Sequence, residues 1–301
     1  MNASVRLLED TLPATVHLQV AVAEAHPSAS VLGTERSGSG AFIHPDGLIV
    51  TVNYIVLGGH EVRVTLFDGR ELAGEVVAQD FATGIALVQV PGDDFPALPV
   101  AADDDAALAV GDEVFIVASV GDAGRRASSG GVTALDPFDA NWEYTLERAI
   151  FTSAMNPGLG GGPLIDRRGR VAGVVSLNLN EIGRFSLAIP IAHYRDHRDE
   201  LLRYGRRTSR PSRAWLGLYC YLLRGHDVVA GLLPGGPAEA AGLAQGDVVI
   251  AVGDSEVRSR REFYERLWDY RAGDEVRLQI FRDESVRTLT IASANVEEFF
   301  R

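Results

Sequence analysis

The stretch Thr152-Ser-Ala-Met-Asn-Pro-Gly-Leu-Gly-Gly-Gly-Pro-Leu-Ile165 decides the fold assignment. Its glycines let the backbone turn tightly and approach a neighbouring group closely. A phosphate-binding loop does not account for these glycines, because such a loop leads into a helix and contains Gly-Lys-Ser/Thr. This run leads instead into the apolar segment Pro163-Leu-Ile165, and the chain contains no Lys at all. The stretch therefore indicates a tight turn that enters a β-strand.

Short apolar segments surround this stretch on both sides and are separated by turn signals. His44-Pro-Asp-Gly47 and Asp68-Gly69 are two such turns, since Pro presets φ and Gly accepts positive φ. The spacing predicts strands and favours an all-β barrel or sandwich. The predicted strands cover residues 16–22, 41–43, 48–52, 61–67, 72–78, 85–90, 113–120, 131–135, 149–152, 163–165, 171–177 and 185–189.

The pattern changes after residue 190, where a helix is predicted over 191–204. A polar, turn-rich linker follows, and a smaller unit begins at Ala214. That unit has strands predicted at 216–222, 228–232, 247–252, 275–281 and 287–291, and helices at 237–241 and 259–270. The length of 301 residues fits two domains. The predicted division is an N-terminal segment 1–13, a barrel domain 14–195, a helix end and linker 196–213, a second domain 214–295 and a tail 296–301.

Composition excludes several classes of function. The formal net charge of −13 and the lack of a long basic run argue against binding to nucleic acid or to anionic membranes. A single cysteine, Cys220, excludes an intrachain disulfide and any Cys-based zinc site. The acidic cluster Asp103-Asp-Asp105 lacks the spacing of a calcium loop, so neither a metal nor a cofactor is expected. The N-terminal sequence resembles no signal peptide and no apolar run is long enough for a membrane span, which predicts a cytoplasmic location without membrane insertion.

The glycine-rich stretch strongly resembles the nucleophile loop of HtrA (Deg-type) serine proteases, whose pattern is Asn-Pro-Gly-Asn-Ser-Gly-Gly-Pro-Leu. Further blocks resemble this family in the same order, and together they cover about residues 14–195. These blocks are Gly38–Gly47, Leu48–Val56, Asp80–Val90 and Phe185–Pro190. The resemblance implies a mostly β fold with a trypsin-like double six-stranded β-barrel.

The second unit resembles the PDZ domain of the same family, which is a small, partly open α+β barrel. Pro237-Ala-Glu-Ala-Ala-Gly-Leu-Ala-Gln-Gly-Asp-Val-Val-Ile250 resembles its signature. PDZ domains bind peptides or protein C-termini by strand addition, with the terminal carboxylate held by backbone N–H groups of a loop. The resemblance places that loop at Trp215, Leu216, Gly217 and Leu218, and the groove helix at 259–270. Phe263 and Leu267 are named as peptide-binding residues of that helix and are also expected to face inward, and the sequence leaves open which of its faces borders the groove.

The three positions that carry the family's catalytic triad hold other residues here. Tyr54 stands at the His position, Gly84 at the Asp position and Gly160 at the Ser position. Gly158, Gly160 and Gly161 would form only a vestigial oxyanion loop. Since the triad acts as a unit, these replacements predict that the chain is not an enzyme. We also expect the Tyr54 ring to fill the space beside the missing side chains.

The resulting prediction is a proteolytically inactive HtrA-like pseudoprotease that acts as a peptide-binding scaffold, adaptor or chaperone-like subunit in protein quality control. One alternative is a serine endopeptidase with a relocated nucleophile, for which Ser153 near His60 is the one candidate pair worth naming. A second alternative is a purely structural assembly subunit. The family resemblance also implies a homotrimer or a mixed assembly with an active paralogue.

Overall fold

The computed structural model describes residues 3–102, 108–122, 124–179 and 183–301, and the chain divides into two compact units. Unit 1 comprises residues 1–24, 32–138 and 146–208. Unit 2 comprises residues 25–31, 139–145 and 209–301. The segment 139–145 therefore groups with unit 2, although the chain on either side of it belongs to unit 1. The acidic cluster Asp103–Asp105 lies outside the described residues.

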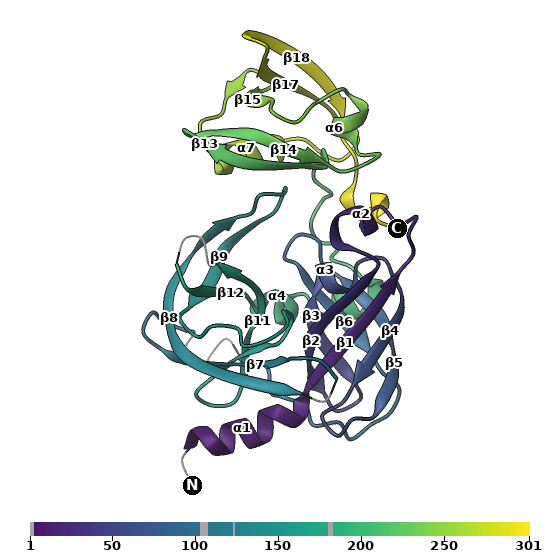
Figure 1. Ribbon diagram of the computed structural model, residues 1–301, viewed down its shortest axis with the longest axis vertical. Coiled ribbons are helices and arrows are strands. Elements are labelled where there is room, and N and C mark those ends of the chain that lie inside the picture. The colour runs from purple at the N-terminus through teal and green to yellow at the C-terminus, as the bar shows by residue number, and fades with distance from the viewer. Residues whose placement is uncertain (1–2, 103–107, 123, 180–182) are drawn as a thin grey trace. The chain divides into compact units, whose positions relative to one another are not determined.

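Unit 1 contains two closed six-stranded barrels (Figure 1). The first has the order β1-β2-β3-β6-β5-β4, and closure leaves no strand edge unpaired. In β3 (Leu48–Val52) all five residues are buried, which suits its β-branched composition. The other strands of this barrel are β1 (Thr15–Val22), β2 (Glu35–His44), β4 (Gly59–Thr65), β5 (Glu71–Gln79) and β6 (Ile85–Gln89), and α1 (Ala3–Ala14) and α3 (Asn53–Val56) contact its strands. The short helix α2 (Ala29–Leu32) falls mostly in unit 2.

The second barrel closes in the order β10-β11-β12-β9-β8-β7. Its strands are β7 (Glu113–Ser119), β8 (Arg125–Asp139), β9 (Thr145–Thr152), β10 (Pro163–Asp166), β11 (Val171–Leu179) and β12 (Phe185–Pro190). The helix predicted over 191–204 is two helices, α4 (Ala192–Asp196) and α5 (Arg198–Tyr204), because His197 leaves helical geometry with φ −123° and ψ 15°. The mostly β, double-barrel fold that the sequence predicts is confirmed.

Unit 2 is built on a twisted antiparallel sheet in the order β13-β14-β15-β17-β18, with β13 at one edge (Figure 1). Its strands are β13 (Leu218–Leu223), β14 (His226–Leu232), β15 (Val248–Val252), β16 (Ser255–Glu256), β17 (Glu275–Arg282) and β18 (Ser285–Ala292). Its helices are α6 (Pro237–Ala240), α7 (Arg260–Leu267) and α8 (Val296–Phe299). Ser259 caps α7 by accepting a hydrogen bond from the Glu262 N–H, and the fully buried Phe263 and Leu267 anchor the helix in the core.

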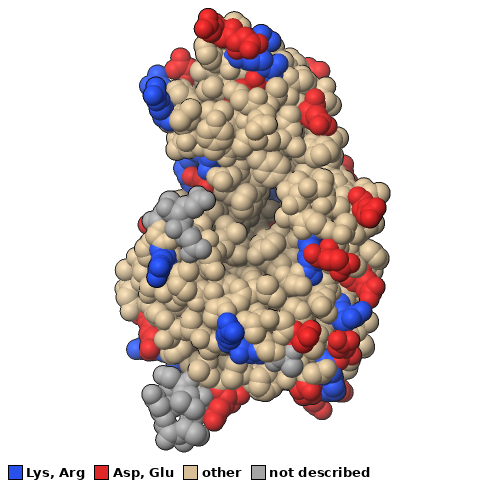
Figure 2. Space-filling model, viewed as in Figure 1, with Lys and Arg blue, Asp and Glu red and all other residues tan. Residues whose placement is uncertain are grey.

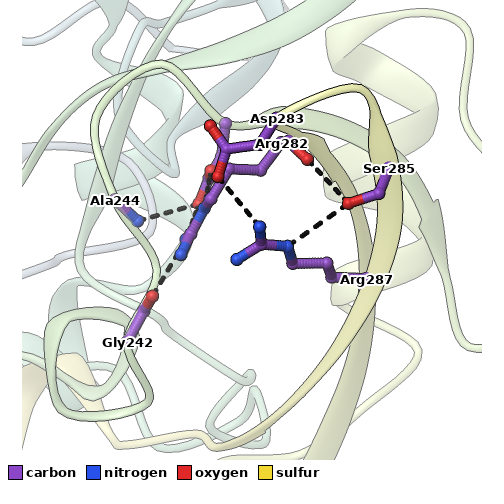
Figure 3. A network of polar contacts seen from close by, with 7 residues as sticks. Gly242, Ala244, Arg282, Asp283, Ser285 and Arg287 are labelled. Atoms are coloured by element: carbon purple, nitrogen blue, oxygen red, sulfur yellow. Dashed lines mark hydrogen bonds and ion pairs between the residues drawn. The ribbon is translucent and has the colours of Figure 1, made fainter.

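A network of polar contacts ties the loop before β15 to the β17–β18 hairpin (Figure 3). The Arg282 guanidinium pairs with the buried carboxylate of Asp247 and donates to the Gly242 carbonyl at 2.9 Å. The other Asp247 contact comes from the Ala244 N–H, at 2.8 Å. A planar guanidinium that pairs with a carboxylate through two N–H groups fixes direction as well as distance. The network therefore holds the loop after α6 in one position.

Charged side chains of both signs are interspersed on the face shown in Figure 2, without a broad basic surface there. Such a mixed surface gives no sustained positive potential for a polyanion. Within the described parts of the chain, no helix is long and apolar enough to cross a membrane.

Candidate functional site

In unit 1, Tyr54 occupies the space next to Gly160. The side chain comes from α3, which follows β3 directly, and its hydroxyl donates to the Ser176 carbonyl of β11 at 2.8 Å. A Cβ atom at Gly160 would collide with that hydroxyl. Burial raises the pKa of Tyr54 to about 12, so the phenol stays protonated near neutral pH. The side chain therefore donates a hydrogen bond and cannot act there as a general base.

Gly84 helps to position Tyr54 through the hydrogen bonds of its backbone. Its φ of +80° lies in the left-handed region, where a side chain would be strained. The Gly84 N–H donates to the Asp80 carbonyl at 2.8 Å, and the Gly84 carbonyl accepts from the Asn53 N–H at 2.7 Å. The second bond fixes the start of α3 and therefore the base of the Tyr54 side chain.

The backbone N–H groups of the glycine loop after Asn156 form hydrogen bonds within the second barrel. The Leu159 N–H donates to the Ser119 carbonyl at 2.9 Å, and the Gly161 N–H donates to the Val175 carbonyl at 2.7 Å. The Gly158 N–H contacts the Asn156 side-chain oxygen at 3.3 Å. An oxyanion hole needs backbone N–H groups that are aimed at the substrate. In this conformation the N–H groups of residues 158, 159 and 161 are aimed at other parts of the chain.

The structure does not join the predicted alternative pair, Ser153 and His60. Ser153 Oγ accepts a hydrogen bond from the Gly131 N–H at 3.0 Å in the second barrel, whereas His60 is exposed on β4 of the first. A Ser–His contact that the sequence analysis missed is Ser119 Oγ to His17 Nδ1, at 2.9 Å. Both residues are buried, at 0% and 2% exposure, and burial lowers the pKa of His17. A substrate cannot reach this pair without rearrangement of the barrels.

In unit 2, the Trp215–Leu218 loop holds a carboxylate of the chain itself. The backbone N–H groups of Leu216 and Gly217 each donate to the Glu143 carboxylate at 2.7 Å, and the Leu218 N–H donates at 3.2 Å. Gly217 has a φ of +79°, which turns successive N–H groups toward one point. The loop thus has the geometry of a carboxylate-binding site.

The residues before Glu143 run antiparallel to β13, the edge strand. The Cys220 N–H donates to the Asn141 carbonyl at 2.7 Å, and Trp142 forms a bridge with Tyr219. From α7, the Tyr264 hydroxyl donates to the Ala140 carbonyl at 2.9 Å. Residues 139–143 therefore lie along β13 and contact α7, as an added strand does in peptide recognition.

Two helix residues named from the sequence do not line this groove. Phe263 and Leu267 are both 0% exposed and belong to the core of unit 2. Their helical spacing is that of an apolar face, and the apolar face packs inward. The helix presents Arg260, Arg261 and the Tyr264 hydroxyl to residues 139–143 instead. Only the polar character of the two arginines could have indicated this from the sequence.

The start of the carboxylate-binding loop is fixed by aromatic packing. The Trp215 ring lies 4.8 Å from the Phe299 ring and 5.8 Å from the Phe300 ring, between centroids. Trp215 also exchanges two backbone hydrogen bonds with Ala294, at 3.1 and 2.9 Å. His26 adds a ring-nitrogen contact to the Phe300 carbonyl at 2.9 Å. These contacts keep the loop in position independently of what it binds.

Comparison with known proteins identifies both domains. Residues 38–174 match the family described as a trypsin-like peptidase domain, and residues 215–292 match the PDZ domain family. Proteins similar to this chain include ones named DegP-like and HtrA-type. Both domains of the chain resemble those of the HtrA-type family. The resemblance inferred from the glycine loop and from the second unit is thereby confirmed.

Two curated relatives illustrate the likeness. A "Probable periplasmic serine endoprotease DegP-like" of Halomonas elongata is 32% identical over 288 residues, which cover 88% of this chain and 58% of the relative. A "Putative serine protease HhoB" of Synechocystis is 27% identical and the match covers 85% of this chain and 66% of the relative. The HtrA-type chain thus spans about half to two thirds of the length of these relatives.

Solved structures show the same fold. The serine endoprotease from Yersinia pestis superposes with a TM-score of 0.58 at 21% identity, and covers 98% of both chains. The HtrA-type protease AlgW with a tripeptide superposes with a TM-score of 0.58 at 22% identity, over 98% of this chain and 97% of AlgW.

These relatives contradict the prediction that the chain is not an enzyme, because they are named as serine endoproteases and proteases. That prediction rested only on Tyr54, Gly84 and Gly160. These three residues show that the His, Asp and Ser side chains of the family's catalytic triad are absent at these positions. They do not test whether a different residue of the chain supplies a nucleophile.

Proposed function

We propose that this HtrA-type protein recognises extended peptide segments with a carboxylate in the groove between β13 and α7. The observation that carries the proposal is the convergence of the Leu216, Gly217 and Leu218 N–H groups on one carboxylate. Three backbone donors are a good receptor for a peptide C-terminus, since charge-assisted hydrogen bonds are stronger than neutral ones. The edge position of β13 supplies the backbone pairing that a bound strand needs.

Fluorescence polarisation with labelled peptides tests this proposal. Peptides that end in a free carboxylate are expected to bind, and the same peptides with an amidated end are expected to bind at least about tenfold more weakly. Gly217→Val should abolish binding, because it forces a β-branched residue into positive φ within the loop. Gly273→Val is the matched control, since Gly273 has a φ of +92° and open space around its Cβ position. If no carboxylate peptide binds the chain or a Glu143→Ala variant of it, the proposal is wrong.

A second candidate function is serine endopeptidase activity, and the names of the relatives favour it. Because Gly160 has no hydroxyl, the nucleophile would come from another serine of the chain. A fluorophosphonate probe combined with a casein cleavage assay tests this candidate. Labelling of one serine together with casein turnover would support it, and the labelled peptide would identify the residue. Turnover without a labelled serine would exclude a serine nucleophile.

The cellular role and the assembly remain proposals. Recognition of exposed peptide segments fits a scaffold, adaptor or chaperone-like subunit in protein quality control. A homotrimer, or a mixed assembly with an active paralogue, follows from the family resemblance alone. A purely structural subunit is the alternative that peptide binding would exclude.

A further inference from the structure

The groove of unit 2 is occupied by the chain itself. Its occupant is the groove segment, which we define as residues Asp139–Glu143, from the last residue of β8 into the loop before β9. Every residue of this segment contacts β13, its preceding loop, or α7. The segment contributes backbone pairing, a carboxylate and polar side chains, which are the features of a peptide ligand.

The groove segment makes its strongest contacts through the carboxylate of Glu143, its last residue. One Glu143 oxygen accepts from the Leu216 N–H and the other accepts from both Gly217 and Leu218. Glu143 is partly buried in this position, so water competes little for its oxygens. The three N–H groups are fully used by this side chain, and a peptide carboxylate could bind them only after Glu143 leaves.

The other end of the groove segment is held by two arginines of α7. Arg261 donates to both Asp139 oxygens, at 3.1 and 2.8 Å. Arg260 donates to the Asn141 side-chain oxygen at 2.8 Å and to the Cys220 carbonyl at 3.2 Å. Arg260 is only 14% exposed and also pairs with the buried Asp227 at 3.1 Å. Its position is therefore fixed before any ligand arrives.

We infer that the groove segment is an internal competitive ligand, which keeps the peptide groove closed until an external peptide displaces it. The inference rests on the proposed function, since it concerns the same groove. A tethered ligand has a high effective concentration, so it lowers the apparent affinity for every external competitor. The groove then responds only to peptides that bind better than the segment does.

The contacts of the groove segment also define its competitor. The competitor is an extended peptide that places a carboxylate in the Leu216–Leu218 loop. It carries an acidic side chain four residues earlier, at the distance that separates Asp139 from Glu143 in the chain. That acidic group would take the place of Asp139 on Arg261. A peptide with a basic residue at this position would face Arg260 and Arg261 and be rejected by like charge.

Removal of the Glu143 carboxylate tests the inference. The probe is a fluorescein-labelled peptide of residues 136–143, Asp-Pro-Phe-Asp-Ala-Asn-Trp-Glu, with an amidated end so that only side-chain carboxylates are present. Glu143→Ala is expected to raise the affinity of the full chain for this peptide by at least about tenfold, as the loss of one charge-assisted hydrogen bond would. Glu143→Gln preserves the shape and should raise it less. Glu265→Ala, at an exposed glutamate of α7, is the control and should leave the affinity unchanged.

A second measurement uses no external peptide. Hydrogen exchange of the Leu216, Gly217 and Leu218 amides should be slow in the wild-type chain and faster by at least about tenfold in Glu143→Ala. An unchanged melting temperature confirms that the variant is folded. Equal peptide affinity in wild type and Glu143→Ala would overturn the inference and leave peptide recognition intact. Faster exchange in a variant that binds no peptide, including peptides with a free carboxylate, would support the internal ligand and contradict the proposed function. Unchanged exchange would overturn the inference directly.

Discussion

The two candidate sites of this molecule are both filled by the chain's own side chains, but by different means. In unit 1 the Tyr54 ring lies next to Gly160, on a one-turn helix that begins right after β3. In unit 2 the Glu143 carboxylate lies in the loop formed by Leu216–Leu218. Tyr54 is neutral and makes one hydrogen bond across the barrels, whereas Glu143 is an ionisable group that accepts three.

This difference separates a fixed contact from a displaceable one. Tyr54 cannot leave without moving α3, whose start is fixed by the Asn53 N–H bond to Gly84. The groove segment is bound by hydrogen bonds and ion pairs that a peptide could reproduce, and Ala140 is its only fully buried residue, so its release exposes little apolar surface. Occupation of a site by the chain therefore means structural support in unit 1 and, by our inference, competition in unit 2.

The largest expected effect concerns the fixed contact. Gly160→Ala should lower the free energy of unfolding by about 1–3 kcal/mol, because its Cβ would collide with the Tyr54 hydroxyl. In a Tyr54→Phe background the same substitution should cost clearly less, since the remaining contact is the Ser176 carbonyl at 3.2 Å. Tyr54→Phe alone should cost about 1 kcal/mol through its lost hydrogen bond. Urea denaturation of the four chains measures this coupling.

Gly131→Ala is the matched control for that cycle. A Cβ at Gly131 would lie 3.7 Å from the Asp112 carbonyl, which is an ordinary contact. Its cost should be small and independent of residue 54. If Gly160→Ala costs the same with Tyr54 as with Phe at that position, then Tyr54 does not fill the space beside Gly160 in solution.

The sequence predicts more of the barrels than of the groove. The turn His44–Gly47 and the apolar run after it define β3 at its observed bounds, because both signals are local. The mostly β fold follows from many such local signals. Tyr54 and Gly160 were placed together by family motifs alone, since 106 positions separate them in the chain and neither residue indicates a contact.

The groove segment could not be predicted for a related physical reason. Glu143 and Leu216 are 73 residues apart, and a single glutamate in a loop between two strands has the pattern of an ordinary solvated residue. Phe263 and Leu267 of α7 were named as peptide-binding residues for another reason. Helical spacing alone does not distinguish an apolar face that packs in the core from one that lines a groove. Only the fold determines that this face packs inward and that Arg260 and Arg261 border the groove.

The next effect concerns the pH dependence of the displaceable contact. Burial raises the pKa of Glu143 from 4.5 to about 7, against the smaller opposing effect of its three N–H donors. The docked carboxyl therefore holds its proton more tightly than a free one. Docking is strongest below about pH 4.5 and weakens as pH rises through about 7, so the protection of the Leu216–Leu218 amides from hydrogen exchange should fall by up to about tenfold from about pH 6 to about pH 8.

Hydrogen exchange of these amides at several pH values, expressed as protection relative to the intrinsic exchange rate at each pH, measures this change. Other ionisable groups face Glu143 or its neighbours in the groove, and burial raises the pKa of several of them. These groups are Tyr219 and Cys220 of β13, Asp227 of β14, and Tyr264 and Arg260 of α7. Glu143→Gln separates their contribution from that of Glu143, since it should remove the pH dependence of this amide protection between about pH 6 and about pH 8. A pH dependence that persists in Glu143→Gln would assign the effect to another of these groups.

The smallest expected effect concerns the far end of the groove segment. Arg261→Ala removes the paired bonds to Asp139, whose side chain is 23% exposed, so water recovers part of the lost interaction. A partly exposed pair is worth about 0.2–1 kcal/mol, which predicts about 1.4- to fivefold faster exchange of the Leu216–Leu218 amides. Arg266→Ala is the control, because its 3.6 Å pair with Asp269 is exposed on the same helix and lies outside the groove contacts. If Arg261→Ala accelerates exchange as strongly as Glu143→Ala does, the two ends of the segment dock as one cooperative unit. If it has no more effect than Arg266→Ala, the carboxylate alone holds the segment, and the acidic residue four positions earlier is no requirement for a competitor.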